Sequence, residues 1–320
     1  MNSKKIIHGI TGLMLAGFLL FMTSCKKDKN DNPATNTITD VVVANSNFSL
    51  LKQAVVKAGL DATLNGAGPF TVFAPNDAAF AAAGIDAAAI NSLSSSDLQA
   101  ILLYHTLGSE VKAANVPAGP NAKVVTAGGD SVFVTKNANG VFVNGVQVIQ
   151  ADIAADNGVI HAIGKVLLPP SGNIVETAVA AGLDSLVKAV LRATNAAGGD
   201  PNLASTLSSA TLTVFAPTNA AFTQLLGALS LNDINDIPVA TLLAVLRYHV
   251  VGGRAFSSDL ANGSLAMLAG GNTTINLSNG TGGGPSITGN GNSGSLSNIV
   301  ATNIVCRNGV VHLIDRVLLP

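Results

Sequence analysis

The chain carries one eleven-residue phrase twice, and this repetition constrains the fold more than any other feature. The copies are Phe70–Phe80, FTVFAPNDAAF, and Leu212–Phe222, LTVFAPTNAAF. In each copy the β-branched and aromatic run Thr-Val-Phe predicts a strand. Proline then ends the strand because it has no N–H to donate, and Asn76-Asp77 or Thr218-Asn219 can cap a helix containing Ala-Ala-Phe. Each phrase therefore predicts a strand, a corner and a capped helix.

Two further blocks recur in the same order. A predicted helix ends at Tyr-His in both copies, at Tyr104-His105 and at Tyr248-His249. The closing block is DNGVIHAIGKVLLP at 156–169 and RNGVVHLIDRVLLP at 307–320. These repeats predict a first domain at residues 38–170 and a second domain at residues 171–320.

Other segments are expected to follow from the local pattern. Between the Tyr-His pair and the closing block of the first domain, short Val-rich runs separated by Gly and Asn turns predict strands. In the second domain, residues 178–191 predict one opening helix, and its AAGLD resembles the KAGLD that ends at Asp61. The Gly/Ser/Asn-rich stretch 270–297 is expected to be an elongated, mobile hairpin loop.

Composition limits the class of protein. Hydrophobic residues are 48% of the 320, enough for two cores, and Trp is absent. A net charge of −1, with 11% charged residues, argues against nucleic-acid binding, which needs a concentrated basic face. The two cysteines, Cys25 and Cys306, predict no intrachain disulfide, because Cys25 falls in a targeting segment. Cys306 is expected to be a small buried hydrophobe in a strand.

The N-terminus has the pattern of an export signal. Lys4-Lys5 precedes an uncharged apolar run that ends in Met-Thr-Ser-Cys25. This end resembles the lipobox of bacterial lipoproteins, which implies a signal peptide at residues 1–25, cleavage before Cys25 and lipidation of that cysteine. An ordinary signal peptide and a short membrane anchor are the alternatives. Residues 26–37 are polar and predict a flexible tether, which resembles the export signal of surface lipoproteins in Bacteroidetes-type bacteria.

The three repeated blocks resemble those of the fasciclin (FAS1) family in both order and spacing. The resemblance covers nearly everything after the tether and implies an α+β fold. Each of the two tandem domains would be a wedge or sandwich of β-sheet with a helical subdomain. It also implies extracellular adhesion or matrix association without catalysis. Asn303 stands where the first copy has Asp152, which puts in doubt for the second copy the adhesive role that the family associates with the Asp152-Ile153 step.

The candidate binding residues lie in or near the repeated blocks: Tyr104, His105, Asp152, Ile153, Tyr248 and His249. Each Tyr/His pair could contact metal, haem or a partner. The structural alternative is that the histidine binds backbone carbonyls while the tyrosine packs with its hydroxyl bonded. We favour the structural alternative because a metal site needs three or four converging ligands, and the sequence offers no cluster of carboxylates or cysteines. We expect no metal, no cofactor and no catalytic residue.

The sequence predicts a lipid-anchored adhesion or matrix-binding protein of the cell envelope. It would be an outer-membrane lipoprotein exposed at the surface, held by its lipid and binding an extracellular protein or glycan. The alternative is a periplasmic or surface module for a small ligand or polysaccharide. Gly289–Gly294 reads G-x-G-x-x-G, but no helix is predicted after it, as a dinucleotide site would need. Isolated carboxylates give a glycosidase no support.

Overall fold

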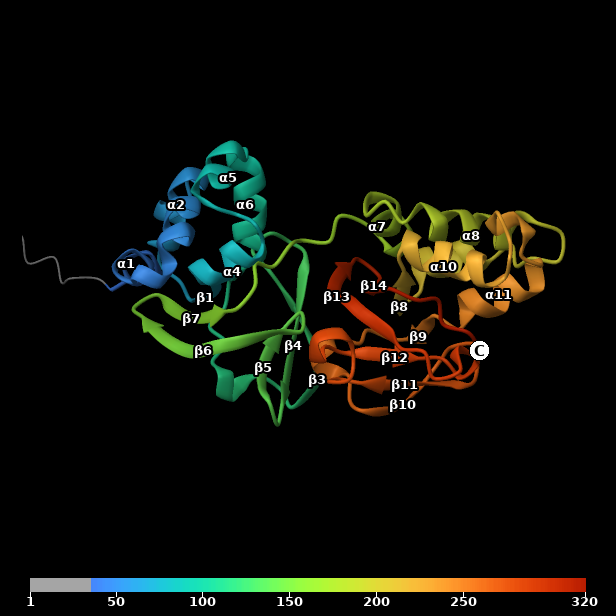
Figure 1. The fold of residues 1–320 in the computed structure, drawn as a ribbon. Helices are drawn as coiled ribbons and strands as arrows, with labels where there is room; N and C mark the ends of the chain where they lie inside the picture. Colours follow the sequence, from blue (N-terminus) through green and yellow to red (C-terminus); the bar gives the residue numbers. More distant parts are fainter. Residues whose placement is uncertain (1–35) are drawn as a thin grey trace, which may run out of the picture. The chain divides into compact units, whose positions relative to one another are not determined.

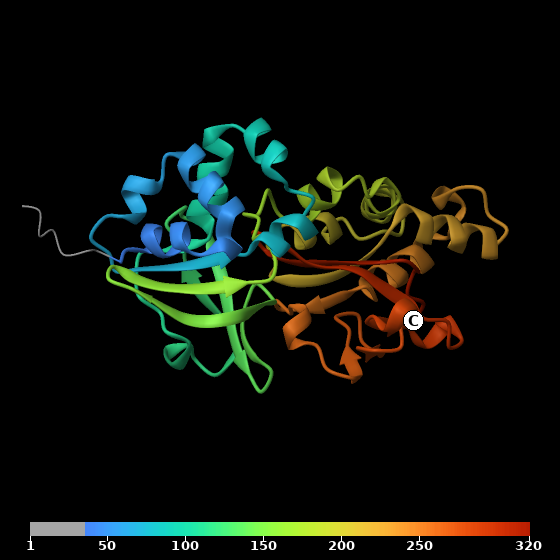
Figure 2. The same cartoon turned by 60° about the vertical axis from the view of Figure 1, so that its left-hand side comes forward.

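The computed structural model describes residues 36–320. The predicted signal peptide, Cys25 and most of the predicted tether lie outside the described residues. The expected α+β fold is confirmed, because each of the two domains has a seven-stranded sheet and a set of helices. In each domain the helices lie along one side of its sheet (Figure 1), and the turned view in Figure 2 agrees.

Within the described residues, the first domain consists of six α-helices and seven strands. Its helices are α1 (Ile38–Ala44), α2 (Ser49–Ala58), α3 (Asp61–Leu64), α4 (Asp77–Ala82), α5 (Ala87–Ser92) and α6 (Ser95–Tyr104). Its strands are β1 (Phe70–Pro75), β2 (Thr106–Leu107), β3 (Gly119–Val125), β4 (Ser131–Asn137), β5 (Gly140–Val143), β6 (Val146–Ala155) and β7 (Gly158–Ile163).

The second domain repeats this order, except that the 3-10 helix Ile234–Asp236 stands where the first domain has α5. Its helices are α7 (Ile174–Ala180), α8 (Asp184–Asn195), α9 (Leu203–Ser209), α10 (Asn219–Ala228) and α11 (Val239–Arg247). Its strands are β8 (Leu212–Pro217), β9 (Val250–Gly252), β10 (Gly263–Ala266), β11 (Asn272–Asn276), β12 (Ser286–Thr288), β13 (Ser297–Cys306) and β14 (Gly309–Ile314).

Both sheets have equivalent topology. The strand order is β2-β1-β7-β6-β5-β4-β3 in the first domain and β10-β11-β12-β13-β14-β8-β9 in the second. The repeated phrase pairs in parallel with the closing block, as β1 with β7 and β8 with β14, and the other pairings are antiparallel. The long strands β6 and β13 each carry register shifts, which bend the sheet at the bulge.

The repeated strand is buried on both faces, so it serves two cores. In β1, Val72 and Ala74 pack with the helices, whereas Phe73 packs among the strands. In β8, Val214 and Ala216 face the helices and Phe215 faces the strands. Because side chains alternate along a strand, one Val-Phe-Ala run can supply both layers of the domain.

The predicted helix caps are confirmed. The Asn76 side chain accepts a hydrogen bond from the N–H of Ala79, and Thr218 accepts one from Ala221. These bonds satisfy N–H groups that the first turn of a helix leaves free. The polar residues that follow each proline therefore have a structural explanation.

The expectation of one opening helix at residues 178–191 was wrong. The chain forms two helices, α7 and α8, separated by Gly182, whose φ of 65° ends the first. The resemblance between the two Gly-Leu-Asp sequences is out of structural register, because Gly59 ends the second helix of its domain. The true correspondence is marked by two capping boxes, Thr37 with Asp40 and Asn173 with Glu176.

The expectation of a mobile hairpin loop at 270–297 was also wrong. This stretch contains β11 and β12, which are inner strands of the sheet. The residues of its G-x-G-x-x-G sequence form a short 3-10 turn in which the buried Asn292 accepts the N–H of Leu319 and donates to the carbonyl of Val317. The low-complexity sequence thus forms sheet and holds the closing block.

Cys306 lies at the end of β13 and is buried, as predicted. None of the helices within residues 36–320 combines the length and apolar character that crossing a membrane requires.

Candidate functional site

His105 and His249 bond the end of a helix to the closing block of the same domain. His105 Nδ1 donates to the carbonyl of Ile101 at 2.8 Å, and its Nε2 accepts the N–H of Leu167 at 2.9 Å. His249 repeats both bonds, donating to the carbonyl of Val245 at 2.7 Å and accepting from Leu318 at 2.9 Å. Both nitrogens of each ring are therefore occupied.

Burial keeps these two imidazoles neutral. It lowers the pKa of His105 and of His249 to about 4, against the smaller raising effect of the bond to the helix carbonyl. A buried neutral ring with both nitrogens bonded has no lone pair to offer a metal. Partner contact at the Tyr-His pairs would accordingly have to run through neighbouring surface residues.

His161 and His312, in the closing blocks, hold a loop against the sheet. His161 Nε2 donates to the carbonyl of Val111 at 2.8 Å, and its ring stacks on Phe73 with centroids 5.7 Å apart. His312 donates to Ala255 at 3.0 Å and stacks on Phe215 at 5.3 Å. The four histidines of the repeated blocks thus form the same network twice.

The two tyrosines are buried beside this network. The Tyr104 hydroxyl donates to the carbonyl of Ser131 at 3.1 Å and accepts from the side chain of Asn144 at 2.9 Å. Burial raises the pKa of Tyr104 to about 12, so the hydroxyl remains protonated. Tyr248 donates to the carbonyl of Asn272 and accepts the N–H of Asn290 at 3.3 Å. Both rings are below 3% exposed.

Asp152 lies apart from the Tyr-His pair, at the bulge of β6. Its φ is 57°, its N–H donates to His161 Nδ1 at 3.2 Å, and its side chain accepts the N–H of Ala113 at 2.9 Å. The carboxylate remains 42% exposed, and Ile153 beside it is half-buried. Among the described residues, Asp152 shares no hydrogen bond with Tyr104 or His105.

Asn303 occupies the equivalent position at the bulge of β13 in the second domain and makes equivalent bonds. Its φ is 65°, its N–H points to His312 Nδ1 at 3.4 Å, and its side chain accepts the N–H of Ser257 at 2.8 Å. Asp and Asn both tolerate positive φ better than other residues with a Cβ. The exchange of Asp for Asn therefore preserves the bulge, removes the charge and adds a donor, which Asn303 gives to the hydroxyl of Ser257 at 2.7 Å.

Within residues 36–320 no group of three or more His, Cys, Asp or Glu side chains is placed to hold a metal ion.

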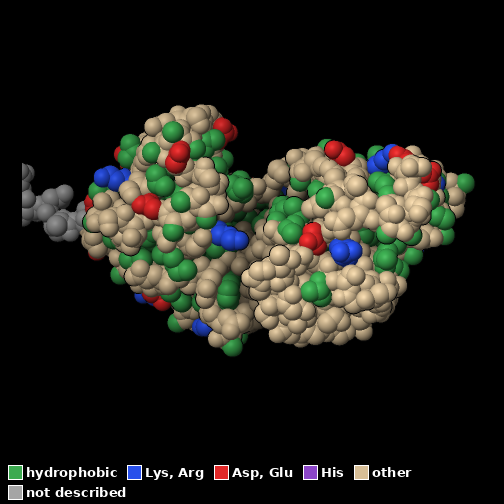
Figure 3. All heavy atoms as spheres, viewed as in Figure 1, with side chains coloured by type: hydrophobic (Ala, Val, Ile, Leu, Met, Phe, Trp, Pro, Cys, Tyr) green, Lys and Arg blue, Asp and Glu red, His purple; other side chains and the backbone are tan. Residues whose placement is uncertain are grey.

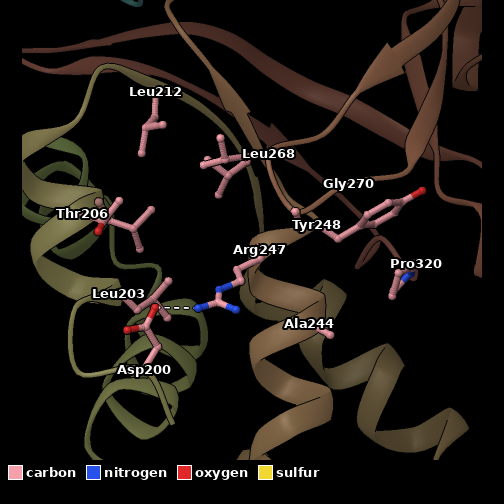
Figure 4. A pocket seen from close by; sticks show the side chains of 13 residues that line it. Asp200, Leu203, Thr206, Leu212, Ala244, Arg247, Tyr248, Leu268, Gly270 and Pro320 are labelled. Atoms are coloured by element: carbon pink, nitrogen blue, oxygen red, sulfur yellow. Dashed lines mark hydrogen bonds and ion pairs between the residues drawn. The ribbon is translucent and has the colours of Figure 1, made fainter.

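The second domain has a pocket that the sequence did not reveal (Figure 4). It has a volume of about 600 Å³ and lies between α9, α11 and the turn that joins β10 to β11. Arg247 reaches across it from the last turn of α11 and pairs with Asp200 at 2.7 Å. The N–H of Asn202 first, and Arg247 second, hold the pKa of Asp200 below its ordinary value.

The walls of this pocket are largely aliphatic. Leucines line it from α9, from the start of β8 and from the turn, and Tyr248 contributes to the lining. The leucines are Leu203, Leu207, Leu212 and Leu268. One signal in the sequence could have indicated the site: Arg247 precedes Tyr248-His249 where the first copy has the apolar Leu103.

Comparison with known proteins agrees with the duplicated architecture. The fasciclin domain model matches residues 46–169 and 187–320. Protein sll1483 of Synechocystis is 43% identical over 138 residues, covering 42% of this chain and 74% of that protein. The transforming growth factor-beta-induced protein ig-h3 of Sus scrofa is 36% identical over 144 residues, covering 45% of this chain and 21% of that protein.

Human periostin aligns over both domains, with 28% identity over 267 residues, covering 80% of this chain and 29% of periostin. The chain thus spans less than a third of the length of ig-h3 or of periostin. Since the family model matches most of the sequence in two separate segments, the chain belongs to the fasciclin domain family and contains the domain twice.

Proposed function

We propose that this protein is an adhesion or matrix-binding protein of the cell surface that acts through its two fasciclin domains. The observation that carries the proposal is the state of the histidines and tyrosines in the repeated blocks. They are buried and hydrogen-bonded to the fold, so the domains offer a partner surface contact and not acid–base or metal chemistry. Binding without catalysis is the function that this arrangement supports best.

The surface favours a protein partner over a glycan. The large exposed hydrophobic side chains of the described residues are all aliphatic, including Val43, Val56, Val179 and Leu191. Sugar-binding sites commonly use exposed aromatic rings, whose faces pack against the ligand. On the face shown in Figure 3, acidic and basic side chains are sparse and scattered, which favours neutral polar and aliphatic contacts.

Two domains on one chain would strengthen a modest contact. When one domain is bound to an extended target, the second binds from a high effective concentration, so overall affinity rises without new contacts. Lipidation of Cys25 would hold both domains at the envelope, since each buried CH₂ of an acyl chain contributes about 0.8 kcal/mol. The polar residues after Cys25 would serve as the spacer.

The experiment is protease shaving of intact cells that express the full chain, with Cys25→Ser as the matched control for anchoring. We expect the wild-type domains to be removed from intact cells, and the Cys25→Ser domains to be recovered away from the membrane fraction. Binding to surfaces coated with matrix proteins or with polysaccharides then separates the two partner classes. Full protection until the outer membrane is opened would contradict the adhesion proposal and favour the periplasmic module for a small ligand or polysaccharide.

A further inference from the structure

The turn between the third and fourth strands of the first domain closes against the helix before Tyr104. In this turn, Ala127 donates to the carbonyl of Thr106, and Gly128 donates to the carbonyl of Leu103 at 3.2 Å. A Cβ on Gly128 would lie 3.4 Å from backbone atoms of Leu103 and Tyr104, which is ordinary van der Waals contact. In the first domain the turn therefore packs directly on the end of the helix and is bonded to it.

The equivalent turn of the second domain leaves that contact unmade. Leu268 donates to the carbonyl of Val250, just as Ala127 does to Thr106, which fixes the correspondence of the two turns. Ala269 then occupies the place of Gly128, and within residues 36–320 its N–H makes no bond to the carbonyl of Arg247. The pocket lies where the turn of the first domain is bonded to its helix.

The polar part of this pocket is the ion pair of Arg247 and Asp200, which has no net charge and keeps unused hydrogen-bond donors. Arg247 donates to Asp200 through Nη2 alone among the described residues, which leaves Nε and Nη1 for a ligand. The Arg247 side chain is 47% exposed and that of Asp200 is 22% exposed, so the pair lies at the mouth. Leu268, 57% exposed, forms the apolar part of the rim.

We infer that this pocket binds an aliphatic side chain of a protein partner together with the uncharged backbone amide beside it. The volume lies within the range of ligand sites, and the leucine walls fit a Leu-sized group. An amide both accepts from Arg247 and donates to Asp200, whereas a charged ligand group would have to compete with one member of the pair. This inference rests on the proposed function, since it names a feature of the partner.

The test uses three leucine derivatives of different charge, titrated into the full chain labelled for amide NMR. N-acetyl-leucine amide is neutral, N-acetyl-leucine is anionic and leucine amide is cationic. We expect the neutral probe to shift the amide signals of 268–270, with a Kd on the order of millimolar for so small a ligand. We expect each charged probe to bind at least about fivefold more weakly than the neutral probe. The turn 127–129 of the first domain is the internal control.

Two variants make the assignment specific to the pocket. Arg247→Leu installs the residue of the first domain and should abolish the shifts. Asp200→Asn leaves Arg247 unpaired, so the preference should change to anionic N-acetyl-leucine. The matched control is Asp233→Asn, which removes an acid from the ion pair with Lys188, outside the pocket in the same domain. This control should leave the preference for the neutral probe unchanged.

Equal binding of all three probes, or unchanged binding by Arg247→Leu, would overturn the pocket assignment. The proposed function has a separate readout, adhesion of the wild-type chain to protein-coated surfaces. Wild-type adhesion that Arg247→Leu leaves intact would refute the inference about the pocket and leave the adhesion proposal standing. No wild-type adhesion to any protein would refute the adhesion proposal, whatever the probes show.

Discussion

The two fasciclin domains use one polar framework and differ beside it. Thr71 and Thr213 hold corresponding loops. The Thr71 hydroxyl donates to the carbonyl of Ser109, and the Thr213 hydroxyl donates to the carbonyl of Gly253. The four histidines and the two buried tyrosines likewise bond and pack in corresponding ways. Elements that fix the sheet to the helices have been kept in both copies.

The two domains differ at positions that take no part in these shared hydrogen bonds. Leu103 becomes Arg247 on a helix face, and Gly128 becomes Ala269 in a turn. Together these changes coincide with a pocket in the second domain at a place that the first domain closes. The comparison teaches that the repeated blocks report on folding, whereas the positions that differ beside them are the better guide to binding.

Acid should unfold both domains through the same buried histidines. The pKa of His105 and of His249 lies near 4 in the folded chain, below the ordinary value of 6.5. The stability that comes from keeping them neutral is present above pH 6.5 and is lost as pH falls toward 4. The loss is on the order of 3 kcal/mol for each histidine. Urea unfolding at a series of pH values measures it, and a flat profile between pH 6.5 and 4 would contradict the shared framework.

Removing one histidine should destabilise its own domain. His249→Ala leaves the N–H of Leu318 buried without an acceptor and opens a cavity, which together cost about 2–4 kcal/mol. Thermal unfolding should show one transition lowered, and His105→Ala should lower the other. Lys52→Ala, at an exposed position of α2, is the control and should change neither. Unchanged stability with lost adhesion would show that the histidines act in binding.

The exchange at the bulge separates a structural role from a binding role. Asp152→Asn should change stability by less than about 0.5 kcal/mol, because Asn303 fills the same position in the second domain. Asp152→Ala should cost about 1–2 kcal/mol, since it loses the bond to Ala113 and adopts positive φ with strain. Chemical unfolding measures both variants. Loss of adhesion in Asp152→Asn at unchanged stability would show that the exposed carboxylate contacts the partner.

The break between α7 and α8 should depend on the backbone conformation of Gly182. Gly182 has a φ of 65°, and nothing lies within 4 Å of a Cβ built there. Gly182→Ala should therefore cost only the backbone strain, about 1 kcal/mol. The melting temperature of the second domain measures this cost. A stabilising effect would mean that the two helices join in solution, as the sequence pattern suggested.

The fold could be predicted because its signals are local and occur twice. The strand, the proline and the cap of each phrase can each be recognised from a few adjacent residues. Because the blocks occur twice in the same order, the match is not a coincidence. The break between α7 and α8 was not predicted, because the sequence around Gly182 is equally consistent with a tolerated glycine inside one helix. The strands within 270–297 were not predicted, because the Gly-rich composition gives no strand pattern. Their pairing with β13 is set by partners distant in sequence.

The site was harder to predict than the fold. Tyr104, His105, Tyr248 and His249 carry chemical groups, but sequence alone does not tell a bonded core histidine from a free one. The pocket depends on Arg247, Asp200 and a turn whose proximity only the folded chain establishes. No residue type in it stands out by itself.

The most direct test of the difference between the domains is residue-resolved amide hydrogen exchange on the full chain. The Gly128 N–H is bonded to the carbonyl of Leu103, so its exchange should be protected. The Ala269 N–H makes no such bond to Arg247, so it should exchange much faster. Equal protection of the two amides would mean that the second turn also closes on its helix, and would contradict a pocket particular to the second domain.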